Sequence, residues 1–246
     1  MGNIQRIIDD LVDANHILAN EDVVDAYGHV SVRHPEKPDR FLLSRSRSPE
    51  LVEAKDILEF DMNGEPVAPG PTPYLERFIH AGIYAARPEI NAVIHSHADV
   101  VLPFTITDMP LRPVIHVSSD MGAVAPVWDI SDKFGDTNLL VVNMEQGRDL
   151  AQCLANNNTV LMRGHGFSVA GRSLVETVKI AVYLPRNARI LLEALRLGQV
   201  KYLTEGEINI RREVKPDAPQ MTRAWDYWKA RADASSHSHA TSGNKK

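Results

Sequence analysis

Two histidines separated by one residue, His95 and His97, follow an apolar run at residues 91–94 that is typical of a buried strand. Because side chains two residues apart point to the same face of a strand, both imidazoles are expected on one side of the strand end. Imidazole nitrogens bind Zn²⁺, Mn²⁺, Fe²⁺ and Co²⁺. The spacing predicts a pair of metal ligands, although a histidine on a strand can also be purely structural.

A third histidine, His165, lies between Gly164 and Gly166, after a second apolar run at residues 159–162. Glycines on both sides permit close backbone approach and unusual dihedral angles, which a ligand on a sharp turn requires. A closed structural zinc site would need a fourth ligand, usually cysteine. Cys153 falls inside a predicted helix without ligand spacing. We therefore expect an open, catalytic metal site.

Glu76 is the next candidate, because it falls near the start of a helix predicted over residues 73–87. From the sequence pattern alone, an acidic residue stabilised by the helix dipole is the favoured interpretation. His80 lies one turn later on the same helical face and is predicted to be structural, although it could also tune the pKa of the glutamate. Asp99, after His97, could orient a ligand or cap a helix, and we favour the cap.

Helices and strands alternate along the chain, and no linker separates them. Hydrophobic periodicity predicts helices at residues 4–19, 73–87, 144–156 and 173–196, with Pro185 kinking the last of them or ending its first part. Strands are predicted at residues 28–33, 41–43, 57–60, 91–95, 112–117, 124–130 and 159–163. We expect one α/β domain over residues 1–234 and a disordered low-complexity tail over residues 235–246.

Bulk composition narrows the class of protein. The 246 residues are 43% hydrophobic and 24% charged, which is ordinary for a globular protein. A net charge of −5 argues against a nucleic-acid binder. No apolar run approaches the roughly 20 residues that span a bilayer, and the N-terminus does not read as a signal peptide. With one cysteine, a reducing, cytoplasmic location is expected.

Together these motifs resemble the class II aldolase/adducin family. The resemblance covers residues 5–210 and rests on the order and spacing of residues 28–33, 41–44, 61–64, Glu76, 95–97 and 164–166. It implies a three-layer α/β/α sandwich around a mostly antiparallel sheet, and a homotetramer with sites between subunits. It also implies that His95, His97 and His165 bind a divalent metal beside a catalytic Glu76. Adducin-like members lack the metal histidines. This chain has all three, which favours an enzyme over a scaffold protein.

Three elements differ from the sugar-phosphate aldolases of this family, which bind phosphate with small and amide residues. Gly28-His29 replaces a Gly-Asn, Ser46-Arg47 replaces a Ser-Gly, and Tyr74-Leu75 replaces a Ser-Ser. Arginine in place of glycine fills the space through which backbone N–H groups reach phosphate. The sequence therefore disfavours a phosphate pocket.

The replacing residues suit an aromatic acid. Arg47, helped by Arg45, could bind a carboxylate through paired hydrogen bonds, unless both arginines belong to a solvated loop. Tyr74 could pack against a flat ring. Donors and acceptors are expected from three further side chains, His29, Ser46 and His116.

The resemblance is greatest to the family's decarboxylases of hydroxylated aromatic and pyridine carboxylates. We therefore expect a metal-dependent decarboxylase of a hydroxylated aromatic or heteroaromatic (di)carboxylate, with Mn²⁺ or Zn²⁺ favoured over Fe²⁺ and Co²⁺. The alternatives are an aldolase or epimerase of a sugar or sugar acid, a non-haem iron oxygenase, and a non-catalytic assembly protein of the adducin kind.

Overall fold

A computed structural model describes residues 3–213 and 218–242 of the chain, without the side chains of residues 212 and 236–242. Seven strands form one sheet in the order β3-β2-β1-β4-β7-β6-β5. The strands are β1 (His29–Arg33), β2 (Arg40–Ser44), β3 (Ile57–Asp61), β4 (Ala92–Ser96), β5 (Val127–Trp128), β6 (Thr159–Met162) and β7 (Gly166–Gly171). All neighbouring pairs are antiparallel except β5 and β6.

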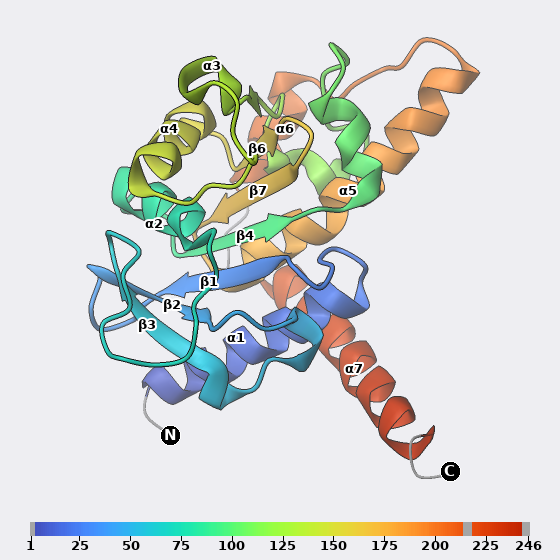
Figure 1. Cartoon of the computed structure of the whole chain (residues 1–246). Coiled ribbons are helices and arrows are strands. Elements are labelled where there is room, and N and C mark those ends of the chain that lie inside the picture. Colours follow the sequence, from blue (N-terminus) through green and yellow to red (C-terminus); the bar gives the residue numbers. More distant parts are fainter. Residues whose placement is uncertain (1–2, 214–217, 243–246) are drawn as a thin grey trace.

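Helices cover both faces of this sheet (Figure 1). The α-helices are α1 (Asn3–Asn20), α2 (Arg77–Ala86), α3 (Ser131–Phe134), α4 (Met144–Leu154), α5 (Leu174–Leu197), α6 (Glu205–Arg212) and α7 (Pro219–Ser242). Short 3₁₀ turns are η1 (Pro49–Leu51), η2 (Ala54–Asp56), η3 (Asp99–Thr105) and η4 (His116–Met121). None of the described helices is both long and apolar enough to cross a membrane.

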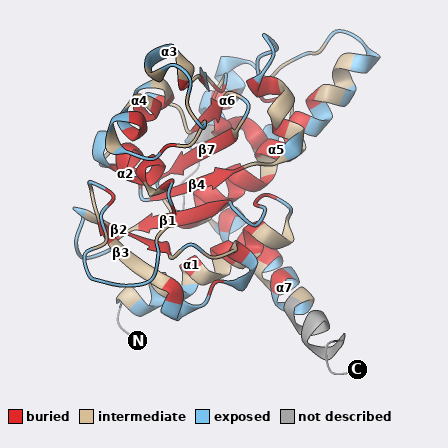
Figure 2. Ribbon diagram, viewed as in Figure 1, coloured by how far each residue is buried: buried red, intermediate tan, exposed pale blue. Residues whose placement is uncertain are grey.

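Alternation along the strands divides the apolar interior into two cores. Val30 and Ile94 pack with residues of α1, α5 and α7 on one face. Phe41 and Val93 pack with residues of α2 and α4 on the other. The central strands are therefore buried on both faces, as Figure 2 shows. This arrangement confirms the predicted three-layer α/β/α sandwich with a mostly antiparallel sheet.

The segment predicted as a strand at residues 112–117 is not one. Pro113 cannot donate to a ladder, and the Asn187 side chain instead bonds this backbone, accepting from the N–H of Val114 and donating to the carbonyl of Arg112. Only Val127–Trp128 is a strand within the predicted 124–130. The strand at Gly166–Gly171 was not predicted, because its glycines and small residues conceal the pattern.

One helix boundary also differs from expectation. Helix α2 begins at Arg77, so Glu76 is its N-cap residue and does not lie inside the first turn. Helix α5 spans Leu174–Leu197, in agreement with the predicted 173–196, and it continues through Pro185. At the C-terminus, α7 continues through the segment from residue 235, for which composition predicted disorder, as far as Ser242. Extending an existing helix needs no new nucleus, so weak helix formers can follow a packed helix. Residues 243–246 lie outside the described residues.

Candidate metal centre and active site

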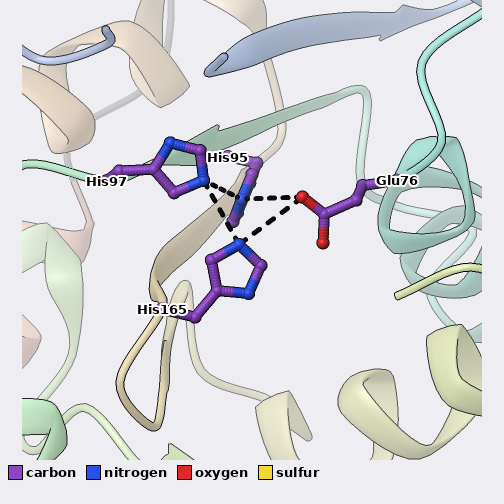
Figure 3. A group of neighbouring side chains, drawn as sticks. All are labelled: Glu76, His95, His97 and His165. Atoms are coloured by element: carbon purple, nitrogen blue, oxygen red, sulfur yellow. Dashed lines mark hydrogen bonds and ion pairs between the residues drawn. The ribbon is translucent and has the colours of Figure 1, made fainter. Parts of the chain in front are cut away.

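The three predicted histidines and Glu76 meet at one point (Figure 3). The Nε2 atom of His97 lies 2.9 Å from Nε2 of His95 and 3.2 Å from Nε2 of His165. One carboxylate oxygen of Glu76, Oε2, lies 3.6 Å from Nε2 of His95 and 3.5 Å from Nε2 of His165. Four ligand atoms from three separate parts of the chain therefore face a common centre.

The β6–β7 turn delivers His165 to this centre, and its two glycines have separate roles. Gly164 has a φ of +62°, in the left-handed region that favours glycine. A Cβ on Gly166 would lie 2.1 Å from the carbonyl oxygen of Ser96, so only glycine lets β7 begin so close to the end of β4. His95 and His97 lie at that end of β4. The predicted function of the glycines is confirmed.

The outward nitrogen of each imidazole has an acceptor that fixes its tautomer. Nδ1 of His95 donates to the carbonyl of Phe167 at 3.1 Å, and Nδ1 of His165 donates to the carbonyl of Leu139 at 3.0 Å. Nδ1 of His97 donates to Oδ1 of Asp25 at 3.1 Å. With each proton held on Nδ1, each Nε2 presents a lone pair to the centre.

This donor set fits a divalent metal ion. The lone pair on Nε2 of His97 lies 2.9 Å and 3.2 Å from those of His95 and His165 and cannot hydrogen-bond to them without a proton to share, so a cation between the three nitrogens accounts for their approach. Two nitrogens bound at right angles about 2.1 Å from one ion lie about 3.0 Å apart, close to the observed spacings. Three imidazoles with a carboxylate suit several transition metals and do not select one.

Asp25 was not predicted from the sequence. Its Oδ1 also accepts from the backbone N–H groups of Tyr27 and Gly28, each at 2.9 Å. Partial burial alone would raise the pKa of Asp25, but the hydrogen bonds from His97 and from these N–H groups outweigh it and lower that pKa. Asp25 is therefore a carboxylate that holds the His97 ring. Asp99, the residue considered for this function, is exposed, and it does not cap η3 either.

Glu76 is held at one oxygen and open at the other. The buried backbone N–H of Val141 donates to Oε1 at 3.0 Å, which leaves Oε2 directed at the histidines. A close crossing of α2 and α4 fixes the position of this residue, because a Cβ on Gly82 would lie 2.3 Å from the carbonyl of Gly147. Glu76 could therefore complete the ligand set or hold a proton beside it.

A cavity of about 590 Å³ opens beside the four-residue cluster. Three of the predicted substrate-binding residues line this cavity, namely His29, Ser46 and Tyr74. The hydroxyl of Tyr74 donates to the carbonyl of Arg47. Leu75 and Leu140 give the lining an apolar part. A flat ring could lie between these side chains, next to the cluster.

Arg47 and His116 do not line this cavity. The Arg47 guanidinium is paired with Asp56 at 3.1 Å and with Glu53 at 3.2 Å, and Arg45 also pairs with Asp56. His116 begins η4 and lines a second cavity of about 680 Å³, together with residues of α5, α6 and α7. Neither residue reaches this cavity within the single chain, so contacts of Arg47 and His116 with a substrate stay predictions.

His29 belongs to a buried polar group that extends from the cavity wall into the interior. Its Nδ1 lies 2.7 Å from Nε2 of His80, whose Nδ1 lies 2.6 Å from the hydroxyl of Ser31. Burial lowers the pKa of His80 to about 3, and burial followed by the nearby His80 lowers the pKa of His29 well below 6.5. Both imidazoles are neutral at pH 7.

Comparisons with known proteins agree with this geometry. Residues 9–192 match the family model described as Class II Aldolase and Adducin N-terminal domain. The chain is 37% identical over 238 residues to "Decarboxylase tropJ" of Talaromyces stipitatus, covering 87% of this chain and 89% of that protein. It is 27% identical over 198 residues to "3,4-dihydroxyphthalate decarboxylase" of Terrabacter sp., covering 76% and 81%.

Among solved structures, an aldolase II superfamily protein from Pseudomonas syringae superposes with a TM-score of 0.79 at 19% identity, covering 96% of this chain and 95% of that one. This likeness concerns the fold alone. The family match spans most of the chain, including Glu76 and all three histidines. The chain therefore belongs to the class II aldolase/adducin family.

Proposed function

We propose that this protein is a metal-dependent decarboxylase of a hydroxylated aromatic or heteroaromatic carboxylate. The observation that carries the proposal is the cluster of His95, His97, His165 and Glu76 at the edge of a cavity with an aromatic and apolar wall. Two relatives whose names include "decarboxylase" support the reaction type. A cytoplasmic homotetramer is part of the same proposal.

The ligand nitrogens of the three histidines would hold a divalent ion, which supplies Lewis acidity and a template for the substrate. Tyr74 and Leu140 flank the cavity and position the ring. Glu76, held by the N–H of Val141, keeps Oε2 fixed for proton transfer to the ring carbon. The bond between that carbon and the carboxylate breaks, CO₂ leaves, and the proton takes its place on the ring.

Purified protein loaded with Mn²⁺ or Zn²⁺ tests the proposal through CO₂ release from a panel of hydroxylated benzene and pyridine dicarboxylates. We expect release from at least one, and a loss of about 10²-fold or more in kcat for Glu76→Gln. Glu50→Gln, an exposed glutamate on η1, is the matched control and should match the wild type.

The alternatives give different results in the same preparation. Cleavage of sugar acids to aldehydes without CO₂ release would indicate an aldolase. Substrate-dependent O₂ consumption would indicate an oxygenase. Protein that binds no divalent metal would indicate an assembly protein of the adducin kind. Unchanged turnover in Glu76→Gln would remove Glu76 from the reaction.

A further inference from the structure

A chain of four hydrogen-bonding side chains runs from the interior to the wall of the cavity. The hydroxyl of Tyr84 lies 2.8 Å from that of Ser31, which lies 2.6 Å from Nδ1 of His80. Nε2 of His80 lies 2.7 Å from Nδ1 of His29. All four residues are buried. His29 and Ser31 share one face of β1, and His80 and Tyr84 are four apart on α2, so strand and helix spacing together build the chain.

Only His29 connects this chain to the cavity. Within the described residues its second ring nitrogen, Nε2, has no hydrogen-bond partner, and the residue lines the cavity. The described lining includes no arginine or lysine. A ligand carboxylate not held by the metal would therefore depend on neutral donors. Those in the wall are Nε2 of His29 and the hydroxyls of Ser46 and Tyr27, and of these three residues only His29 is buried.

The proton positions in such a chain are coupled, and two arrangements satisfy every contact. In one, Tyr84 donates to Ser31, Ser31 to His80, and His80 to Nδ1 of His29, so Nε2 of His29 carries a proton. In the other, each hydrogen bond runs in the opposite direction, from His29 to His80, to Ser31 and to Tyr84, and Nε2 of His29 carries no proton. A phenol is the more acidic and stronger donor of the two hydroxyls, which favours the arrangement that starts at Tyr84.

We propose that Tyr84, Ser31 and His80 lock His29 in the tautomer that presents Nε2–H to an anionic oxygen of the ligand, and that this contact selects dicarboxylates over monocarboxylates. The inference rests on the proposed function and deepens it. His80 is a positioning residue, since it acts through His29 and does not reach the cavity. The ligand oxygen is the carboxylate of an aromatic acid that is not released as CO₂.

The first test reads the tautomer directly and needs no activity. In ¹⁵N-histidine-labelled protein, with His29 assigned by its loss in His29→Gln, we expect Nε2 of His29 to be protonated and Nδ1 bare. Tyr84→Phe should produce a mixture of both tautomers. The matched control is Tyr183→Phe on α5, whose ring packs against Trp228 of α7, and it should leave the signal unchanged. A proton found on Nδ1 of His29 in the wild type would overturn the proposal.

The second test measures ligand binding by calorimetry to Zn²⁺-loaded protein, with phthalate and benzoate as probes that lack the hydroxyl needed for reaction. A hydrogen bond to a charged group predicts that His80→Leu weakens phthalate binding about tenfold to hundredfold and leaves benzoate unchanged. His80→Gln, whose amide N–H can replace the lost donor, should restore most of the affinity.

Equal weakening of both ligands in His80→Leu would assign His80 a purely structural role and refute selectivity. Failure of wild-type protein to bind phthalate more tightly than benzoate would refute the ligand class. Neither readout requires CO₂ release, so a protein that fails the decarboxylase assay can still pass or fail these tests separately.

Discussion

Removing the carboxylate of Asp25 should weaken metal binding without touching a metal ligand. Oδ1 of Asp25 accepts from Nδ1 of His97 and from the N–H groups of Tyr27 and Gly28. Groups that hold a ligating histidine typically contribute 10- to 100-fold to metal affinity. Asp25→Ala removes all three contacts and should lose about that much, or roughly 1.4–2.7 kcal/mol.

Asp25→Asn removes the negative charge of the side chain and keeps its shape. An amide oxygen can still accept from the same three donors, so only the charge assistance is lost, about half the strength of the bond. We therefore expect Asp25→Asn to weaken binding by at most about tenfold. Competition with a chromophoric chelator for Zn²⁺ measures each dissociation constant, and the thermal unfolding of the metal-free variants reports any loss of fold.

The control is Asp99→Asn, because Asp99 is close to His97 in sequence but exposed in the fold. It should bind metal as the wild type does. The reasoning is refuted if Asp25→Ala keeps wild-type affinity, or if Asp99→Asn loses as much.

Three further outcomes follow from the geometry. Gly166→Ala places a Cβ 2.1 Å from the carbonyl oxygen of Ser96 and should lower the free energy of unfolding by about 1–3 kcal/mol, measured by urea titration; an unchanged midpoint would show that β7 can move. Burial lowers the pKa of His80 to about 3, so the unfolded chain binds a proton below pH 6.5 that the folded chain refuses. Stability is then fully present above pH 6.5 and falls toward pH 3 by at most about 1.4 kcal/mol per pH unit, and His80→Gln should flatten this slope in acid urea titrations. Removing the metal with EDTA should lower the melting temperature, since only the folded chain assembles the cluster of His95, His97 and His165; equal melting temperatures with and without Zn²⁺ would contradict a folded-state metal site.

The local parts of the site were predictable because a few adjacent residues determine the geometry of each. The i, i+2 spacing of His95 and His97 and the glycines around His165 specify geometry by themselves. The convergence of the three histidines came from the family resemblance, since nothing local relates His165 to a strand 70 residues earlier. Glu76 was found in the same way, whereas its anchor at Val141 belongs to a loop without periodicity.

The failures have a common physical origin, which is that side chains from distant elements complete the local pattern. Asn187 of α5 binds the backbone at Arg112 and Val114 and replaces the ladder that a strand would need. Asp56 and Glu53 pair with the guanidinium of Arg47, a pairing that the sequence did not predict, and the contact of Arg47 with a substrate carboxylate stays a prediction. Hydrophobic patterns report burial but not which polar group will be opposite, so such pairings cannot be derived from spacing.

Asp25 is different, because the topology could have revealed it. In an antiparallel pair, residues that precede one strand lie beside residues that follow the other. His29 pairs with His95, so the loop just before β1 must lie next to His97, just after β4. An acidic residue in residues 25–28 then becomes the natural acceptor for the Nδ1 proton of His97. A residue that holds a predicted metal ligand can therefore be sought in the loop that lies beside that ligand across an antiparallel strand pair. The Asp25→Ala measurement tests this rule on this chain.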